Sequence, residues 1–234
     1  NSLKKEINKK DLSSIDLIVE ERLKGKPLAY LIGKKGFWKN NFIVTPDVLV
    51  PRPETETLVD AILNENLQDK TLLELGTGSG AISISIAQEN KDCFIFATDI
   101  SIKSILVAKQ NAAKFCCENI IFLNHDWNNE WLFPQVDYLI SNPPYVDRET
   151  TSGKEEGIWH EPEKALFSKD RGLSDLKLIL SKGKNFLNEN GKVYLEHAPD
   201  QYEELNKFAM ENGYLNFSNL NDLNGDKRVS IYQC

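Results

Sequence analysis

From residue 71 onward, short apolar runs alternate with longer stretches whose apolar residues recur at helical spacing. Short apolar runs bounded by turn residues predict buried strands, and recurrence every third or fourth residue predicts helices that bury one face. The pattern predicts strands at 71–75, 93–98, 120–123, 136–141, 192–196, 215–217 and 228–232, and helices at 81–88, 102–115, 173–187 and 202–211. We therefore predict an α/β fold with a seven-stranded, mostly parallel sheet, helices on both faces, and a final antiparallel pair of strands. The weakly periodic, charged stretch 146–168 is expected to be a long loop beside a strand end.

The first part of the chain has a different pattern. Residues 1–25 are polar apart from one amphipathic helix at 16–23, which Gly25 can end. A single amphipathic helix cannot form a core, so this part is expected to be the remnant of an N-terminal helical domain. The chain starts at Asn1 rather than Met, and we expect that it has lost its natural start.

Residues 26–54 are predicted to form a β-hairpin linker. Aromatic and β-branched runs at 37–38 and 42–44 flank Lys39-Asn40-Asn41, which is the expected turn. Two prolines at positions 51 and 53 then favour an extended backbone. Thr55 or Glu54 is predicted to cap a helix that runs to about residue 67. The main domain is expected to span residues 55–234.

Composition narrows the classes of protein. The chain has 234 residues, 41% hydrophobic and 27% charged, as in ordinary globular proteins. We find no transmembrane or signal-peptide pattern, and expect no membrane partner. The net charge is −7, whereas a strong nucleic-acid binder usually has a broad positive surface. Stable nucleic-acid binding is therefore not expected. Four cysteines without a C-x-x-C pair indicate reduced thiols and a cytoplasmic location. Separately, we expect the protein to be a monomer.

A glycine-rich loop follows the first predicted strand of the sheet. Its sequence is Glu74-Leu75-Gly76-Thr77-Gly78-Ser79-Gly80. Glycines let a strand turn sharply into a helix and let a ligand approach the backbone closely. Asp99 ends the next strand, at a distance along the chain that suits a carboxylate on ribose hydroxyls. The loop alone does not distinguish a dinucleotide from another nucleotide-like ligand.

Two further motifs end the third and fourth predicted strands. Asp126-Trp127 could bind the amino edge and the face of an adenine. Asn142-Pro143-Pro144-Tyr145 contains two prolines that cannot continue a central strand, so the backbone must leave the sheet there. The Asn142 side chain and the Pro143 carbonyl are then free acceptors, and Tyr145 offers a flat ring. Together they suit a planar NH2 group held for reaction.

In this order, these motifs resemble those of the class I methyltransferases that use S-adenosylmethionine, which have a Rossmann-like fold. More narrowly, the chain is similar to the peptide chain release factor glutamine methyltransferases, the HemK/PrmC family, from about residue 22 to the C-terminus. The further segments that carry this resemblance are Phe37-Trp38, Pro51-Arg52-Pro53-Glu54-Thr55-Glu56, His160-Glu161-Pro162, Leu195-Glu196-His197 and Gly225-Asp226-Lys227-Arg228.

The resemblance implies an enzyme that methylates the glutamine of the Gly-Gly-Gln loop in peptide chain release factors. Catalysis would rest on Asn142, Pro143 and Tyr145, and substrate binding on Arg52, Glu54, Asn142, Pro143, Pro144 and Tyr145. S-adenosylmethionine would be held by Glu74, Gly76, Thr77, Gly78, Ser79, Gly80, Asp99, Asp126, Trp127 and Asn142. The family has a longer N-terminal helical domain, of which only the last part, about residues 1–25, is expected here.

The expected reaction is a direct, in-line transfer without a metal. His125, His160 and His197 are scattered and lack ligand spacing, so each is expected to be a structural or surface residue, with His160 the nearest to a substrate role. An amino-methyltransferase acting on adenine or guanine in DNA or RNA is the main alternative, because its target nitrogen is equally planar. A nicotinamide-dependent dehydrogenase and a non-catalytic binding module are further alternatives.

Overall fold

A computed structural model describes residues 9–151 and 157–233 of the chain. Its centre is a seven-stranded sheet in the order β5-β4-β3-β6-β7-β9-β8. The strands are β3 (Thr71–Leu75), β4 (Phe94–Asp99), β5 (Ile120–Asn124), β6 (Val136–Ser141), β7 (Leu187–Glu196), β8 (Asn216–Asn221) and β9 (Lys227–Gln233). All neighbours pair in parallel except β9, which is antiparallel to both β7 and β8. The predicted α/β fold class is confirmed.

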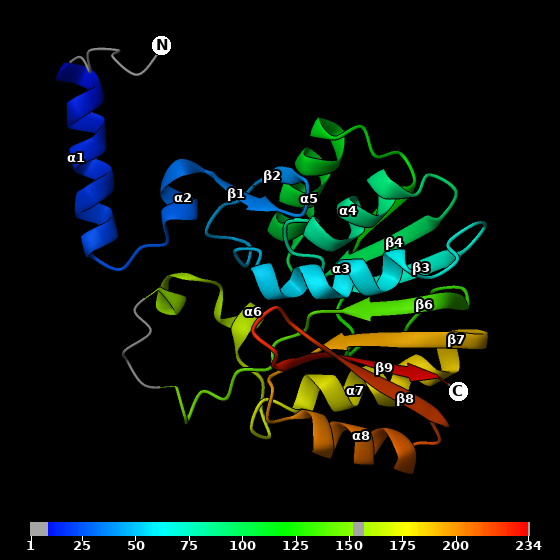
Figure 1. Ribbon diagram of the computed structural model, residues 1–234. Helices are drawn as coiled ribbons and strands as arrows, with labels where there is room; N and C mark the ends of the chain where they lie inside the picture. Colours follow the sequence, from blue (N-terminus) through cyan, green and yellow to red (C-terminus); the bar gives the residue numbers. More distant parts are fainter. Residues whose placement is uncertain (1–8, 152–156, 234) are drawn as a thin grey trace.

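Helices cover both faces of this sheet (Figure 1). On one face lie α3 (Glu56–Leu63), α4 (Ala81–Glu89) and α5 (Ile102–Lys114), and on the other α7 (Ser174–Gly183) and α8 (Tyr202–Glu211). Each face of the sheet has its own hydrophobic core, and strand β3 contributes to both. Leu72 packs in the core beneath α3, α4 and α5, whereas Leu73 and Leu75 pack in the core beneath α7 and α8. All three leucines are fully buried. Their burial explains why the central strands are apolar runs rather than alternating ones.

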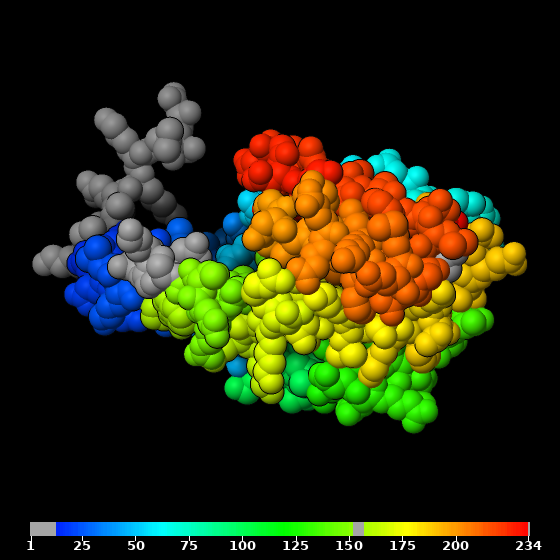
Figure 2. All heavy atoms as spheres, turned by 90° about the horizontal axis from the view of Figure 1, so that it is seen from below, coloured from blue at the N-terminus to red at the C-terminus, as the bar shows by residue number. Residues whose placement is uncertain are grey.

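The N-terminal part consists of α1 (Lys9–Leu23), α2 (Leu28–Ile32) and the hairpin β1 (Lys34–Phe37) and β2 (Asn40–Ile43). Helix α1 ends as predicted, with Gly25 in a left-handed conformation at φ 91°. In Figures 1 and 2, α1 lies at one end of the molecule, beyond the body formed by the sheet and its helices. Seen from below in Figure 2, α7, α8 and the last strands form a continuous surface. The expected division at residues 25 and 54 remains a prediction.

The hairpin turn lies at residues 38–39 and not at 39–41, as the sequence predicted. Phe37 pairs directly with Asn40, which leaves a turn of Trp38 and Lys39 with Trp38 at φ 51°. This register places Phe37 and Phe42 on one face, where their ring centroids are 6.0 Å apart and both rings are buried. A turn centred on Asn40 would put the two rings on opposite faces, so burial of both decides the register.

Two helix ends also differ from the predictions. Helix α7 ends at Gly183, and after η3 (Lys184–Phe186) the chain enters β7 at Leu187. Leu187 is buried and pairs with Val136 of β6, so its apolar side chain belongs to the sheet and not to a longer helix. Helix α3 ends at Leu63, because the chain turns at Asn64 and returns Leu67 to the core.

Part of the predicted loop 146–168 has structure of its own. It contains η2 (Ile158–His160) and α6 (Glu163–Leu166), and Val146 forms an isolated bridge with Phe167. Residues 152–156 lie outside the described residues. Among the described helices, none has the length and apolar character needed to cross a membrane.

Candidate active site

Three neighbouring strands bring the predicted motifs to one edge of the sheet. Leu75 of β3 pairs with Thr98 of β4 and with Ser141 of β6. The next residue on each strand is therefore Gly76, Asp99 or Asn142, and all three lie side by side. Ligands of open α/β sheets bind at this edge, beyond the carboxyl ends of the strands.

A cavity of about 300 Å³ opens at this edge. It is lined by Pro46, Asp47, Val48, Leu49, Gly76, Gly78, Asp99, Ile100, Ser101, Ser104, Trp127, Asn142, Pro144, Pro162, Glu163, Lys164 and Ala165. A smaller cavity of about 50 Å³ is lined by Arg52, Thr55 and Thr77, among others. Leu49, Gly76, Gly78 and Asn142 line both. The Asn142 side chain therefore stands at the junction of a large and a small cavity.

The glycine-rich loop needs glycine for its backbone shape. Gly76, Gly78 and Gly80 have φ values of 78°, 55° and 80°. A Cβ on Gly80 would lie 2.7 Å from Ile84 Cδ1, whereas one on Gly78 would meet nothing within 4 Å. The left-handed backbone thus favours glycine at both positions, and at Gly78 it leaves open space that a ligand could use.

The Asp99 carboxylate holds the loop in place. Its Oδ2 accepts a hydrogen bond from Gly78 N at 2.9 Å, and its Oδ1 accepts one from Ser101 N at 2.8 Å. Helix α5 is capped by Ser101, whose side chain accepts from Ser104 N. Burial raises the pKa of Asp99, while the two backbone donors lower it. Asp99 lines the large cavity, as a ribose-binding carboxylate would need to.

Glu74 lies beneath the loop and lines neither cavity. Its Oε2 accepts hydrogen bonds from the hydroxyls of Thr77, at 2.7 Å, and Ser83. Its Oε1 is buried without a hydrogen-bond partner in the described part of the chain. Burial raises the pKa of Glu74 to about 7. The predicted contact of Glu74 with a cofactor remains a prediction, and in this structure its carboxylate fastens the loop to α4.

Only one residue of the predicted Asp126-Trp127 pair reaches the cavity. The Trp127 ring lies over Gly76, where an added Cβ would be 3.2 Å from the ring, and its Nε1 donates to Asp175 Oδ1 at 3.1 Å. Asp126 lies outside the lining, and its Oδ1 accepts from Asn128 N at 2.9 Å. Trp127 is fixed as a flat wall, whereas Asp126 stabilises the turn that follows it.

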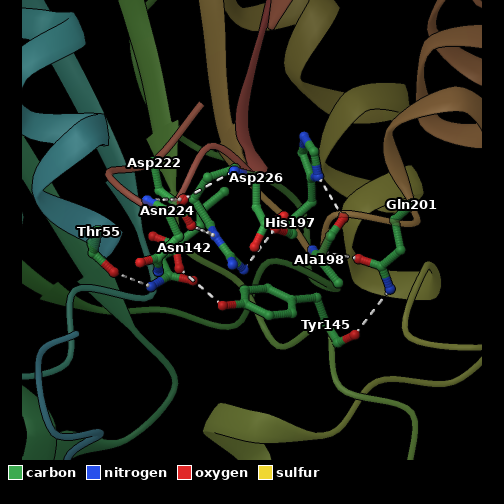
Figure 3. Close-up of polar contacts among 11 residues, drawn as sticks. Thr55, Asn142, Tyr145, His197, Ala198, Gln201, Asp222, Asn224 and Asp226 are labelled. Carbon is green, nitrogen blue, oxygen red and sulfur yellow. Dashed lines mark hydrogen bonds and ion pairs between the residues drawn. The ribbon is translucent and has the colours of Figure 1, made fainter. Parts of the chain in front are cut away.

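Figure 3 shows the side chains that surround Asn142 and Tyr145. Asn142 Nδ2 donates to Thr55 Oγ1 at 3.1 Å, and the Tyr145 hydroxyl donates to Glu196 Oε1 at 2.9 Å. Thr55 therefore does not cap α3 as predicted, since no side-chain capping hydrogen bond is formed and its hydroxyl oxygen instead accepts from Asn142. Pro143 and Pro144 are buried, and Pro144 lines the large cavity. Burial raises the pKa of Tyr145, which keeps its hydroxyl neutral.

Arg52 is held by a residue that lies 109 positions further along the chain. Its Nη2 is 2.6 Å from Glu161 Oε1, and Glu161 Oε2 accepts from Val50 N at 3.0 Å. Glu161 is buried and belongs to the segment between β6 and α7. Arg52 lines the small cavity, whereas Glu54 lines neither. The ion pair thus ties one wall of the small cavity to the segment that borders the large one.

Replacing Glu161 with alanine is expected to lower the free energy of unfolding by about 1 to 3 kcal/mol, because Arg52 and Val50 N–H both lose their acceptor. Chemical denaturation of both proteins measures the difference. Glu204→Ala, which breaks ion pairs with the exposed Arg171 and the partly exposed Lys177, is the control and should have a smaller effect, because water can replace the lost contacts. Equal losses in the two variants would contradict a structural role for the Arg52–Glu161 pair.

The three histidines have separate surroundings. His197 is buried, with Nδ1 2.8 Å from the Ala198 carbonyl and Nε2 2.7 Å from Ser230 Oγ, and burial lowers its pKa. His160 Nε2 lies 3.1 Å from the Lys24 carbonyl. The His125 ring packs edge-on against Phe133. Across residues 9–151 and 157–233, no group of three or more His, Cys, Asp or Glu side chains is placed to hold a metal ion.

Comparisons with known proteins place this chain in a family. Residues 53–169 match the model of the methyltransferase small domain. The chain is 37% identical to the release factor glutamine methyltransferase of Coxiella burnetii, over 97% of this chain and 82% of the relative. It is 36% identical to that of Francisella tularensis, over 99% of this chain and 83% of the relative. The chain belongs to the release factor glutamine methyltransferase family.

Solved structures agree on the fold. A methyltransferase from Pyrococcus furiosus superposes with a TM-score of 0.63 at 18% identity, covering 94% of this chain and 98% of that one. The chain is therefore a methyltransferase with the Rossmann-like fold of class I, as the sequence predicted.

This chain is also 34% identical to a bifunctional methyltransferase of Rickettsia bellii, of which it covers 46%.

Three residues of the site were not predicted from the sequence. The roles of Thr55 beside Asn142, Glu196 beside Tyr145 and Glu161 beside Arg52 depend on contacts between distant segments. The sequence contained a partial signal for two of them, because Glu161 and Glu196 lie in segments that resemble the family. Thr55 was interpreted as a helix cap, since threonine before a helix usually has that role.

Proposed function

We propose that this protein transfers the methyl group of S-adenosylmethionine to the side-chain amide nitrogen of the glutamine in the Gly-Gly-Gln loop of peptide chain release factors. The proposal depends on the position of Asn142. Its side chain lies at the junction of the two cavities, and its amide nitrogen already donates a hydrogen bond to Thr55 Oγ1. The amide oxygen is thereby left to accept a hydrogen bond from a planar NH2 group.

The large cavity fits S-adenosylmethionine. Asp99 offers carboxylate oxygens of the kind that bind ribose hydroxyls, Trp127 a flat wall for adenine, and Gly76 and Gly78 a backbone without Cβ atoms in the way. When bound, the cofactor supplies an electrophilic methyl group on a positively charged sulfur. Pro144 is buried and Trp127 is half-buried, and an apolar surrounding of this kind would favour a transfer in which the positive charge on sulfur is lost.

Asn142 orients the glutamine amide for this reaction. The nitrogen of an amide is a weak nucleophile, because its lone pair is delocalised into the carbonyl group. Asn142 Oδ1 and the Pro143 carbonyl would each accept a hydrogen bond from one of its two N–H groups, and the ring of Tyr145 would pack near the amide plane. Holding two reactants in line can supply up to about 7–11 kcal/mol of the barrier. In such a transfer an N–C bond would form as the C–S bond breaks, and the nitrogen would lose one proton to solvent.

A mass-spectrometric assay tests the proposal directly. A release factor incubated with the enzyme and S-adenosylmethionine should gain a single methyl group, located on the glutamine of its Gly-Gly-Gln loop. A release factor with that glutamine replaced by alanine is the control and should gain none. Methyl transfer to duplex DNA or RNA without transfer to the release factor would contradict the proposal and favour an adenine or guanine amino-methyltransferase.

Ligand-induced stabilisation tests the cofactor separately. S-adenosylhomocysteine, the expected product, should raise the melting temperature, since a ligand at about 100 times its Kd stabilises a folded protein by about 2.7 kcal/mol. NAD at the same concentration is the control and should leave the melting temperature unchanged. Stabilisation by NAD alone would favour a dehydrogenase.

A further inference from the structure

Glu196 is a fully buried carboxylate directly behind the proposed methyl-transfer site. Leu195 pairs with Ser141, so the next residues on β7 and β6 are Glu196 and Asn142, which lie side by side at the same edge of the sheet. Glu196 Oε1 accepts from the Tyr145 hydroxyl, whereas Oε2 is buried without a hydrogen-bond partner among the residues described. Burying a carboxylate is unfavourable unless it is paired or hydrogen-bonded, so its presence here needs an explanation.

Thr55 connects this carboxylate with Asn142. Burial raises the pKa of Glu196 to about 7, and the Thr55 hydroxyl is the largest of the polar influences that lower this pKa, ahead of Tyr145. Thr55 is itself buried, and its oxygen accepts from Asn142 Nδ2 (Figure 3). The hydroxyl of Thr55 therefore has Glu196 on one side and Asn142 on the other.

The single proton of the Thr55 hydroxyl fixes the direction of this chain of contacts. An ionised carboxylate can only accept, and Glu196 Oε2 has no other hydrogen-bond partner among the described residues. The proton of the neighbouring Thr55 hydroxyl is therefore expected to turn toward Glu196. The oxygen of Thr55 can then only accept from Asn142, which must present its NH2 group to Thr55 and its carbonyl oxygen to the cavity. If the hydroxyl pointed the other way, it would favour the flipped amide, with NH2 facing the glutamine nitrogen.

We propose that Glu196 is a positioning residue, which orients Asn142 through the Thr55 hydroxyl and Tyr145 through a direct hydrogen bond. One carboxylate thus sets the side chains of both Asn142 and Tyr145, although of these three residues only Asn142 lines the two cavities. This inference rests on the proposed function, because it concerns how the target amide is oriented.

Variants of Thr55 test the proposal with little change in shape. Thr55→Val is nearly isosteric but lacks the hydroxyl, and we expect kcat to fall about 10-fold or more, since small misplacements of orienting groups have effects of up to about 10²-fold. Thr55→Ser keeps the hydroxyl and should retain kcat within about 3-fold. Affinity for S-adenosylhomocysteine, measured by calorimetry, should be nearly unchanged in both. Thr71→Val, at the other end of β3, is the control for loss of a threonine hydroxyl.

Glu196→Gln tests the carboxylate itself. The amide of glutamine can still accept from Tyr145, but it offers NH2 to Thr55, which reverses the hydroxyl and favours the flipped Asn142. We expect kcat to fall about 10-fold or more, while the melting temperature and cofactor affinity stay close to wild type. Wild-type kcat should also fall as the pH drops through the pKa of Glu196, and this ionisation should be absent from Glu196→Gln.

The groups around Glu196 allow the pH profile to be assigned. Arg228 lowers the pKa of Glu196, Glu54 raises it, and Tyr145 stays neutral because burial raises its own pKa. The neighbouring His197 has a lowered pKa, and Glu74 on the far side of the loop has a raised one near 7. Only an ionisation that disappears in Glu196→Gln belongs to Glu196.

The outcomes separate this proposal from the proposed function. If wild-type enzyme methylates the release factor but Thr55→Val and Glu196→Gln keep full kcat, Glu196 does not position Asn142, and the proposed function stands. Failure of Thr55→Ser to rescue the activity lost in Thr55→Val would also overturn the positioning role. If wild-type enzyme methylates nothing, the proposed function itself fails.

Discussion

Replacing Asn142 with alanine is expected to lower kcat by about 10²- to 10³-fold, which corresponds to about 3 to 4 kcal/mol of the activation barrier. Asn142 stands where the two cavities meet, and its amide oxygen is the proposed acceptor for the target NH2 group. Its removal leaves the amide of the substrate free to rotate away from the line of attack. Steady-state kinetics with a release factor as substrate measures the loss.

The affinity of Asn142→Ala for S-adenosylhomocysteine should change much less than its kcat. Asn142 is one of many residues that line the large cavity, while Asp99, Trp127 and the glycine-rich loop are untouched by the substitution. Asn64→Ala, at the exposed end of α3, is a matched control that removes an asparagine distant from the site. Unchanged kcat, or a loss explained entirely by weaker cofactor binding, would remove Asn142 from the mechanism.

Most of the fold could be predicted because its signals are local. Apolar runs such as 71–75 and 136–141 are strands, since a parallel sheet covered on both faces needs apolar residues at most positions. The position of the candidate site residues could also be predicted, because glycines and prolines after such runs force the backbone out of the sheet at its carboxyl edge. Gly76, Asp99 and Asn142 accordingly lie in one row.

The remaining features could not be predicted because they depend on contacts between distant segments. The turn at residues 38–39 is set by burial of Phe37 beside Phe42, and a turn signal of polar residues does not contain this information. Leu187 has an apolar side chain that fits a helix or a strand equally well, and pairing with β6 decides between them. Likewise, nothing near Thr55 in the sequence indicates that Asn142, 87 positions later, donates a hydrogen bond to its hydroxyl oxygen.

The largest effect on stability is expected at Gly172, where the chain turns into α7. Gly172 has φ +85°, and a Cβ built on it would lie 2.0 Å from the backbone oxygen of Tyr145 and 2.6 Å from Gln201 Nε2. Gln201 Nε2 donates to the same Tyr145 oxygen at 2.9 Å and to the Arg171 oxygen at 3.0 Å. The absence of a side chain at residue 172 therefore allows this turn to pack against the backbone of the proposed catalytic segment.

Gly172→Ala is expected to lower the free energy of unfolding by about 3 kcal/mol or more. A left-handed backbone costs an alanine about 1–2 kcal/mol, and forcing extra volume into a packed site adds about 1–3 kcal/mol. Gly225→Ala is a closely matched control, because Gly225 has φ +88° and a Cβ there meets nothing within 4 Å. It isolates the backbone contribution, so chemical denaturation should show a loss of only about 1–2 kcal/mol.

Since the backbone of Tyr145 must move to relieve the clash, kcat of Gly172→Ala should fall as well. Equal losses of stability in the two variants would mean that Gly172 is needed only for its backbone conformation and that the segment bearing Tyr145 is not held by this contact.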